Sequence, residues 1–357
     1  MALLGMVAIH VLPGQREDGS PTLTDLVASG RSAALFAVLA GVGLGLAFGR
    51  RPSVPRSAAA VLVRAVLIGA VGLALGMLES GVAVILAYYA VFFVLVLPWL
   101  RAAPRVLLPS AAGIALAVPF FSFAVRDGLP PRDTASPVFA DLADPGQLAS
   151  ELLLTGYYPA LAWLAYLLLG LGVGRLALQE RRVAVRLAAA GAAGALAATG
   201  LSYLLLGPVG GYDRLAEVVT LDDGTTVEQL VDAGRFGNVP TTSVWWLATD
   251  APHTSTPLDL LATGGTAMLV LGLALLVTGR AASLLSPLAA AGSMPLTLYS
   301  AHVLLLGTVE TADPVRFYVA QIVAALVAAT LWRRFVGRGP MEAVLAAVAR
   351  PLRAGRT

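Results

Sequence analysis

Histidine is the side chain in this sequence best suited to moving a proton near neutral pH, and the chain of 357 residues contains only three of them. An imidazole can accept a proton from a hydroxyl or amine and return it in a later step. His10 closes the first apolar run, His253 just precedes the run at 258–278, and His302 lies within the run at 284–308. Each is therefore a candidate general base.

Each histidine also has a purely structural interpretation. For His10 the alternative is an interhelical hydrogen bond of the kind that polar side chains make in membranes. For His302 it is a packing pair with Tyr299, and for His253 it is simple solvation in an exposed segment. We rank His10 first, His253 second and His302 third, because His10 lies beside the loop that leads to Arg31.

Arg31 directly precedes the apolar run at 32–49, where a cation meets the positive end of a helix dipole. This unfavourable position indicates an anionic or carbonyl partner, such as the oxyanion of an acyl-transfer reaction. The alternative is an interfacial arginine that reaches toward lipid phosphate. Asp259, three residues after Thr256, is typical of a capping anion at a helix start.

The composition identifies a membrane protein. Of the residues, 58% are apolar and 13% are charged, with a mean hydropathy of +0.81. Soluble domains have about 45–50% apolar and about 25% charged residues, so a water-soluble globule is excluded. The absence of cysteine excludes disulfides, thiolate metal sites and a cysteine nucleophile, and we expect no metal. A net charge of +3 is no signature of nucleic-acid binding.

The elements that must position these residues are membrane helices. A bilayer core needs roughly 20 apolar residues per helix, and the chain has nine such runs and a shorter first one. We therefore expect an all-α, polytopic membrane protein with about ten transmembrane helices. The runs cover approximately 1–13, 32–49, 61–78, 82–100, 106–125, 152–174, 183–206, 258–278, 284–308 and 315–336.

Arginine sets the expected orientation. Every basic residue is arginine, and 17 of the 24 fall in alternate short turns, at the helix edge at Arg64 or after residue 332. Short loops rich in arginine stay cytoplasmic, so we expect a multi-pass protein of the plasma membrane with both termini in the cytoplasm. The long connections at about 126–151 and 207–257 are then external, and we expect them to form a lid over an outward-facing cavity.

The two ends of the chain differ from its middle. Residues 339–357 have apolar side chains at helical spacing and three arginines, which predicts a cytoplasmic amphipathic tail after a transmembrane domain at 1–338. The first run spans only about 20 Å if helical. We therefore expect the native first helix to extend about 10–15 residues upstream of Met1.

Four blocks of sequence resemble a known family, the bacterial membrane proteins grouped with heparan-alpha-glucosaminide N-acetyltransferase, in their actinobacterial branch. The blocks are Ala2-Leu3-Leu4-Gly5-Met6-Val7-Ala8-Ile9-His10, Gly30-Arg31-Ser32-Ala33-Ala34-Leu35-Phe36, Trp245-Trp246 through Pro252-His253-Thr254-Ser255-Thr256-Pro257, and Gly292-Ser293-Met294-Pro295-Leu296-Thr297-Leu298-Tyr299.

The resemblance implies an O- or N-acyltransferase that moves an acyl group from cytosolic acyl-CoA, most simply acetyl-CoA, to an extracytoplasmic glycan or small molecule. His10 or His253 would then be the base, and Arg31 would stabilise the oxyanion. The animal enzyme resembles this chain but has its essential histidine in the loop after the first motif helix. Residues 14–30 contain none here, which excludes an acyl-histidine in that loop.

The expected partners are membrane lipid, acyl-CoA and an extracytoplasmic acceptor, with a homodimer left open and no nucleic acid. Two other functions compete with the acyltransferase. A small-molecule transporter or flippase would place coupling residues near the bilayer midplane on broken helices, whereas the midplane stretches here are almost entirely apolar. The second alternative is a non-catalytic membrane partner protein.

Overall fold

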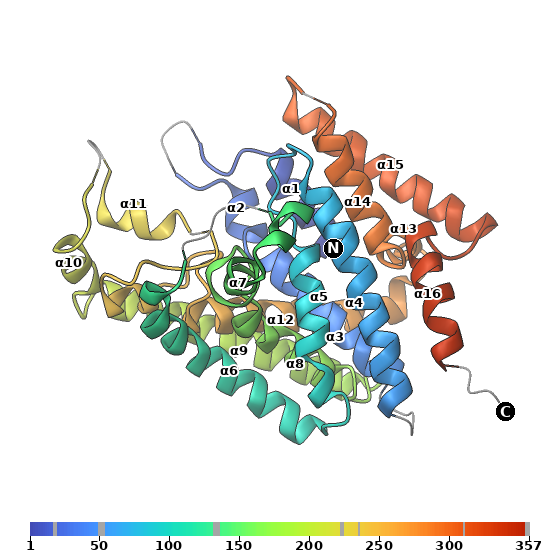
Figure 1. Ribbon diagram of the computed structural model, residues 1–357, viewed down its shortest axis with the longest axis horizontal. Helices are drawn as coiled ribbons and strands as arrows, with labels where there is room; N and C mark the ends of the chain where they lie inside the picture. Colours follow the sequence, from blue (N-terminus) through green and yellow to red (C-terminus); the bar gives the residue numbers. More distant parts are fainter. Residues whose placement is uncertain are drawn as a thin grey trace.

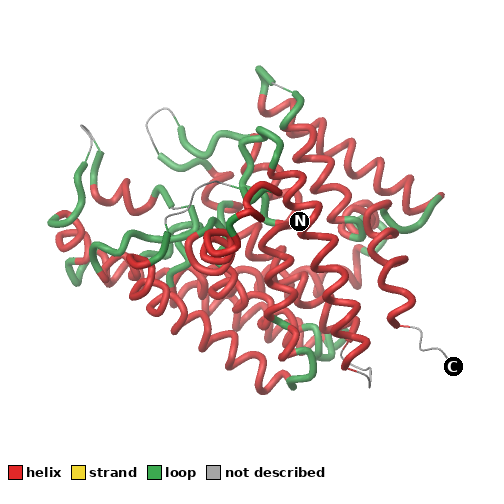
Figure 2. Tube along the Cα trace, in the orientation of Figure 1, coloured by secondary structure: helices red, strands yellow, loops and turns green. Residues whose placement is uncertain are grey.

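The computed structural model describes residues 1–16, 20–48, 54–130, 136–221, 225–234, 236–309 and 311–353. Within these ranges the fold is all-helical. Figure 2 shows helices joined by loops and no strand, and the only β-type pairing among the described residues is an isolated bridge between Gln15 and Pro21. The expected all-α class is confirmed.

The helices occur along the whole chain (Figure 1). The α-helices are α1 (Ala2–Val11), α2 (Leu23–Ala28), α3 (Arg31–Phe48), α4 (Val54–Gly76), α5 (Leu86–Leu95), α6 (Pro104–Val125), α7 (Pro145–Ser150), α8 (Ala160–Val173), α9 (Arg181–Leu206), α10 (Gly211–Ala216), α11 (Val227–Asp232), α12 (Pro257–Ala281), α13 (Ser286–Gly292), α14 (Pro295–Leu306), α15 (Pro314–Phe335) and α16 (Pro340–Arg353). Short 3-10 turns are η1 (Leu97–Trp99), η2 (Arg126–Gly128), η3 (Phe139–Ala143) and η5 (Val244–Ala248), and η4 (Glu151–Thr155) is a π-helical turn.

The number of membrane crossings is smaller than expected. Among the described residues, six helical segments are long and apolar enough to cross a bilayer, or eight if each of two bent helix pairs makes one crossing. The pairs are α7–η4 with α8, bent by 54°, and α13 with α14, bent by 80°. The expectation of about ten crossings is therefore corrected to between six and eight.

The missing crossings are α1 and α5, which have ten residues each. At about 1.5 Å per residue, such a helix covers only about half of the bilayer core. Both helices end close to a proline. Pro13 follows α1, and Pro98 lies in η1 directly after α5. Proline has no backbone N–H to donate to a helical hydrogen bond. It therefore ends a helix within a longer apolar run.

Two of the arginine-rich turns lie together in space. The guanidinium of Arg175, in the α8–α9 turn, donates hydrogen bonds to the carbonyl oxygens of Leu100 and Ala102, in the α5–α6 turn. Figure 1 places these turns at the bottom of the view, whereas α10 and α11 of the connection at 207–257 lie at the left. These two basic turns and the long connection are thus separated in space, and their assignment to opposite sides of the membrane stays a prediction.

The core of the bundle depends on close contact between α3 and α8. Gly41 and Gly45 of α3 face α8, and Gly170 of α8 faces α3. A Cβ atom added at Gly170 would overlap the carbonyl oxygen of Val38, and one added at Gly41 would overlap that of Leu167. Small residues at this interface let two membrane helices approach backbone to backbone.

The amphipathic tail packs against the bundle. Helix α16 contacts α4 and α14. The carboxylate of Glu342 accepts hydrogen bonds from the backbone N–H of Leu296 at 2.8 Å and of Thr297 at 3.1 Å, and from the Thr297 hydroxyl at 2.6 Å. Glu342 therefore caps the N-terminus of α14, where unpaired N–H groups favour an anion.

We predict that Gly170→Ala destabilises the protein by about 1–3 kcal/mol, because the added methyl group must push α3 away from α8. Gly43→Ala is the matched control, since a Cβ atom at Gly43 meets nothing within 4 Å. Thermal unfolding in detergent would measure both variants. Equal melting temperatures for Gly170→Ala and the wild type would contradict the close contact.

Candidate functional site

Two of the three histidines contact each other directly. Nδ1 of His10 lies 3.0 Å from Nε2 of His302, and their rings stack with centroids 5.3 Å apart and planes 7° apart. Nδ1 of His302 in turn lies 2.8 Å from Oε1 of Gln321. His302 is buried, whereas His10 and Gln321 are partly exposed. The side chains of α1, α14 and α15 thus form one hydrogen-bonded chain.

The hydrogen bonds among His10, His302 and Gln321 leave one imidazole nitrogen without a hydrogen-bond partner. His10 uses Nδ1 toward His302, and no hydrogen bond to its Nε2 occurs among the described residues. His10 lies in the last turn of α1, where the helix dipole favours a positive charge. Burial, together with the neighbouring His302 and His253, nevertheless lowers the pKa of His10 to about 3, so the resting imidazole is neutral near pH 7.

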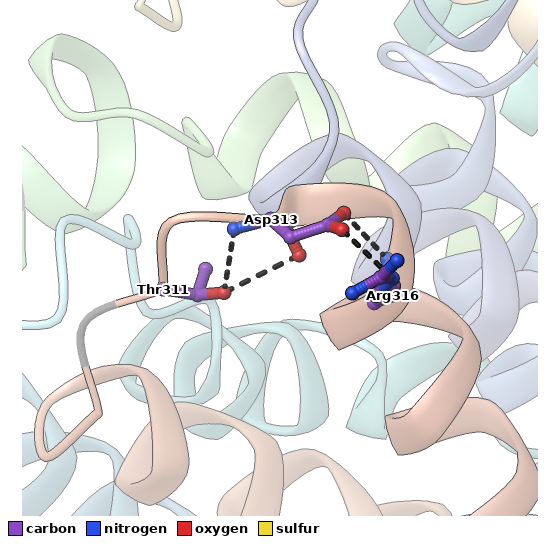
Figure 3. A network of polar contacts seen from close by, with 3 residues as sticks. All are labelled: Thr311, Asp313 and Arg316. Carbon is purple, nitrogen blue, oxygen red and sulfur yellow. Dashed lines mark hydrogen bonds and ion pairs between the residues drawn. The ribbon is translucent and has the colours of Figure 1, made fainter.

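Local sequence fixes each of the three helices. Helix α1 stops at Val11, just before Pro13, and α14 starts at Pro295, whose missing N–H costs nothing in the first turn. Asp313 fixes the start of α15. Its carboxylate accepts a hydrogen bond from the Arg316 N–H at 3.0 Å and forms an ion pair with the Arg316 guanidinium at 3.1 Å (Figure 3). The beginning of α15, and with it the register of Gln321, is thereby defined.

His253 is enclosed by aromatic rings. Its ring centroid lies 5.1 Å from that of Tyr157, 5.7 Å from Tyr158 and 6.4 Å from Trp163. Its Nδ1 is buried without a hydrogen-bond partner. Burial lowers the pKa of His253 to about 4, because desolvation disfavours the charged imidazolium. His253 is therefore packed among aromatic rings and only partly exposed, rather than freely solvated.

The backbone at His253 is held in an unusual conformation. His253 has a φ of 56°, in the left-handed region that non-glycine residues rarely adopt. Its carbonyl oxygen accepts a hydrogen bond from the Gly237 N–H at 2.8 Å. Gly30, with a φ of 65°, packs against Pro252 and His253, so that the start of α3 touches this loop.

Arg31 therefore begins α3 beside the His253 loop. Its Nη1 donates a hydrogen bond to the carbonyl oxygen of Leu26 at 2.8 Å, and its charge acts on the buried carboxylate of Asp259. His253 in turn acts electrostatically on His10. Gly30 thus places Arg31 beside the His253 loop, and no hydrogen bond joins either residue to His10 among the described residues.

Asp259 has the capping role that the sequence predicts. Its backbone N–H donates to the Thr256 hydroxyl at 3.1 Å, and its carboxylate accepts from the Ser255 N–H at 2.9 Å. These bonds organise the first turn of α12 directly below the His253 loop. The capping interpretation is confirmed.

A largely apolar cavity of about 360 Å³ lies at the end of α1 away from His10. It is lined by the first turn of α1 and by parts of α3, α4, α5, α13, α14 and α16. Polar groups in the lining come from Arg64, Tyr89 and Glu342, and the Tyr89 hydroxyl is buried without a partner. The described residues of the connections at 126–151 and 207–257 contribute nothing to this lining, and a lid formed by them stays a prediction.

Three residues of interest were missed in the sequence. Gln321 is an amide in an apolar run, Tyr89 lies among aromatic neighbours, and Glu151 is a carboxylate that is 1% exposed in the π-helical turn η4. A polar side chain within an apolar run was the available signal for Gln321. Among the described residues, no group of three or more His, Asp or Glu is arranged to hold a metal ion.

Comparison with known proteins assigns this chain to a family. The model of the catalytic domain of heparan-alpha-glucosaminide N-acetyltransferase matches residues 1–206, which is more than half of the chain. The chain belongs to this family. Its membership and its long apolar helices make it a multi-pass membrane protein of an acetyltransferase family.

The family match and the hydrogen-bonded chain overlap only in part. His10 and Arg31 lie within the matched residues, whereas His253, His302 and Gln321 lie beyond them. The resemblance expected from the sequence blocks is confirmed. No curated protein and no solved structure matches the chain.

We predict that the folded state loses less stability on acidification when His253 is replaced by asparagine. Between the ordinary pKa of 6.5 and the folded value of about 4, the unfolded state binds more protons at this residue. The free energy of unfolding therefore falls as the pH is lowered through this window. Asparagine removes the titrating group and tolerates the left-handed backbone.

Thermal unfolding of the wild type and His253→Asn at pH 7.5 and pH 5 would measure the effect. The expected result is a smaller decrease in melting temperature for the variant. An equal decrease in both proteins would show that His253 is not buried in its neutral form.

Proposed function

We propose that this protein transfers an acyl group, most simply acetyl, from cytosolic acyl-CoA to a hydroxyl or amine acceptor on the extracytoplasmic side of the membrane. The observation that carries the proposal is the His10 imidazole, held through Nδ1 by His302 with its Nε2 uncommitted. Membership in an acetyltransferase family supports the reaction class.

In this proposal His10 is the general base. Its Nε2 takes the proton from the acceptor as the acceptor oxygen or nitrogen forms a bond to the acyl carbonyl carbon. The carbon–sulfur bond then breaks, and His10 returns the proton to the departing thiolate, so the imidazole is unchanged after a turnover. Arg31 stabilises the negative charge that develops on the carbonyl oxygen.

The apolar cavity at the other end of α1 suits the acyl-bearing arm of the donor. Its apolar lining fits the methylene groups of such an arm, and the buried Tyr89 hydroxyl has a hydrogen bond to give to an amide or thioester carbonyl. Arg64 adds a positive charge to the lining. Helix α1 thus runs from the donor cavity to the proposed base.

His253 contributes to the site as a packing residue in this proposal. Its ring is enclosed by Tyr157, Tyr158 and Trp163 at the break between η4 and α8. A neutral, buried imidazole in this place keeps the loop against Gly30 and thereby holds the start of α3. His10 is left as the histidine that faces substrate.

We predict that His10→Ala lowers kcat by about 10²- to 10⁴-fold, the usual contribution of a general base. Release of radiolabelled acetate or acetylated product from acetyl-CoA by the purified protein would measure the rate, because water can replace an unidentified acceptor. Thr308→Val is a matched control, since the Thr308 hydroxyl bonds only within its own segment, to the carbonyl oxygens of Leu304 and Leu305. A folded His10→Ala protein with wild-type activity would refute the role of His10.

We predict that a cysteine at position 182 is labelled only from the cytoplasmic side and one at position 217 only from outside intact cells. Arg182 lies in the arginine-rich α8–α9 region, Glu217 directly follows α10, and both are exposed. Single-cysteine variants give clean labelling because the native chain has no cysteine. The reverse pattern would overturn the proposed direction of transfer.

A further inference from the structure

We propose that Gln321 is a positioning residue that sets the tautomer of His10 through His302. This inference deepens the proposed function and rests on it. It starts from the chain of two hydrogen bonds that joins Gln321, His302 and His10, at 2.8 Å and 3.0 Å.

The direction of these bonds follows from the chemistry of their atoms. The Oε1 atom of Gln321 has no proton and can only accept, so Nδ1 of His302 must donate to it. A neutral imidazole has a single N–H, and Nε2 of His302 is therefore an acceptor. Nδ1 of His10 must then donate to that nitrogen. Nε2 of a neutral His10 is left with its lone pair.

This tautomer is the one that a general base needs. A proton placed on Nε2 of His10 would block its use as a base, whereas a proton on Nδ1 leaves it ready to accept. When Nε2 of His10 accepts a proton, the hydrogen bonds through His302 share the positive charge toward the carbonyl oxygen of Gln321. The amide thus orients both rings without touching substrate.

Gln321 is a polar residue in apolar surroundings. It is the sole amide in α15, a helix that is otherwise dominated by apolar residues. A polar amide in an apolar layer is costly unless it is hydrogen-bonded. Oε1 of Gln321 is bonded to His302, whereas its Nε2 is buried without a partner. Among the described residues, the titratable groups that act on His10 are His302 and His253, and His253 is enclosed by aromatic rings. Control of the His10 tautomer therefore falls to His302 and Gln321.

Two substitutions separate this role from a structural one. Gln321→Leu removes the acceptor, so His302 can place its proton on Nε2 and force His10 to carry its own proton on its Nε2. We expect kcat to fall by about 10- to 100-fold with little change in KM. Gln321→Glu keeps an accepting oxygen and adds a charge that favours imidazolium. We expect it to retain activity, with the acidic limb of the pH–rate profile moved up by about one pH unit.

The control is Thr330→Val, because the Thr330 hydroxyl donates to Leu326 within α15 and reaches no histidine. Its pH–rate profile should match that of the wild type. Equal profiles for wild type, Gln321→Leu and Gln321→Glu would overturn the proposal.

A readout without turnover keeps this test separate from the proposed function. Nitrogen-15 NMR of histidine-labelled protein in detergent distinguishes protonated from unprotonated ring nitrogens, and His10→Gln assigns the signals. We expect Nε2 of His10 to be unprotonated in the wild type and in Thr330→Val, and protonated in Gln321→Leu. A protonated Nε2 in the wild type would refute the inference even if His10 proves essential, and the expected tautomer in an inactive protein would refute only the proposed reaction.

Discussion

The hydrogen bond between His10 and His302 is the interaction on which the arrangement of the site depends. It joins two residues that are 292 positions apart, in helices from opposite ends of the chain. Polar groups in an apolar layer must find partners within the protein, since no water compensates them. The imidazoles of α1 and α14 and the carbonyl oxygen of the α15 amide bond to one another, which holds the short α1 beside α14 and α15, whereas Nε2 of Gln321 is buried without a partner.

The two broken helix pairs raise the question of transport, because transporters bind substrates where membrane helices are interrupted. In transporters the freed N-terminus of a half-helix commonly faces an anionic substrate group. Here the N-terminus of α14 is occupied by the carboxylate of Glu342 from α16. At the other break, the N–H of Tyr157 donates to the Tyr88 hydroxyl. The N-terminus of α8 has no side-chain cap. Of the two described breaks, the one before α14 is thus closed by a carboxylate, which fits a fixed reaction site better than a passage at that place.

The sequence identified the histidines as candidates but could not pair them. Ranking by position put His302 last, because nothing in a single helix shows which neighbour it faces. Its partners come from α1 and α15, and their contact depends on the 80° bend between α13 and α14. His253 was ranked second as a base, with solvation as the alternative, yet the break between η4 and α8 supplies Tyr157 and Tyr158 to cover it.

The sequence by itself determined the membrane class, the helical fold, the family and the segregation of arginine, because these follow from composition, apolar run length and local motifs. It also determined local caps such as Thr256 before Asp259, which need only a few adjacent residues. Only the tertiary structure decided how many runs form long helices, where the cavity lies and which groups meet. Those outcomes arise from contacts between distant segments, such as Glu342 on α14 and Gln321 on His302, and periodicity along one helix carries no information about them.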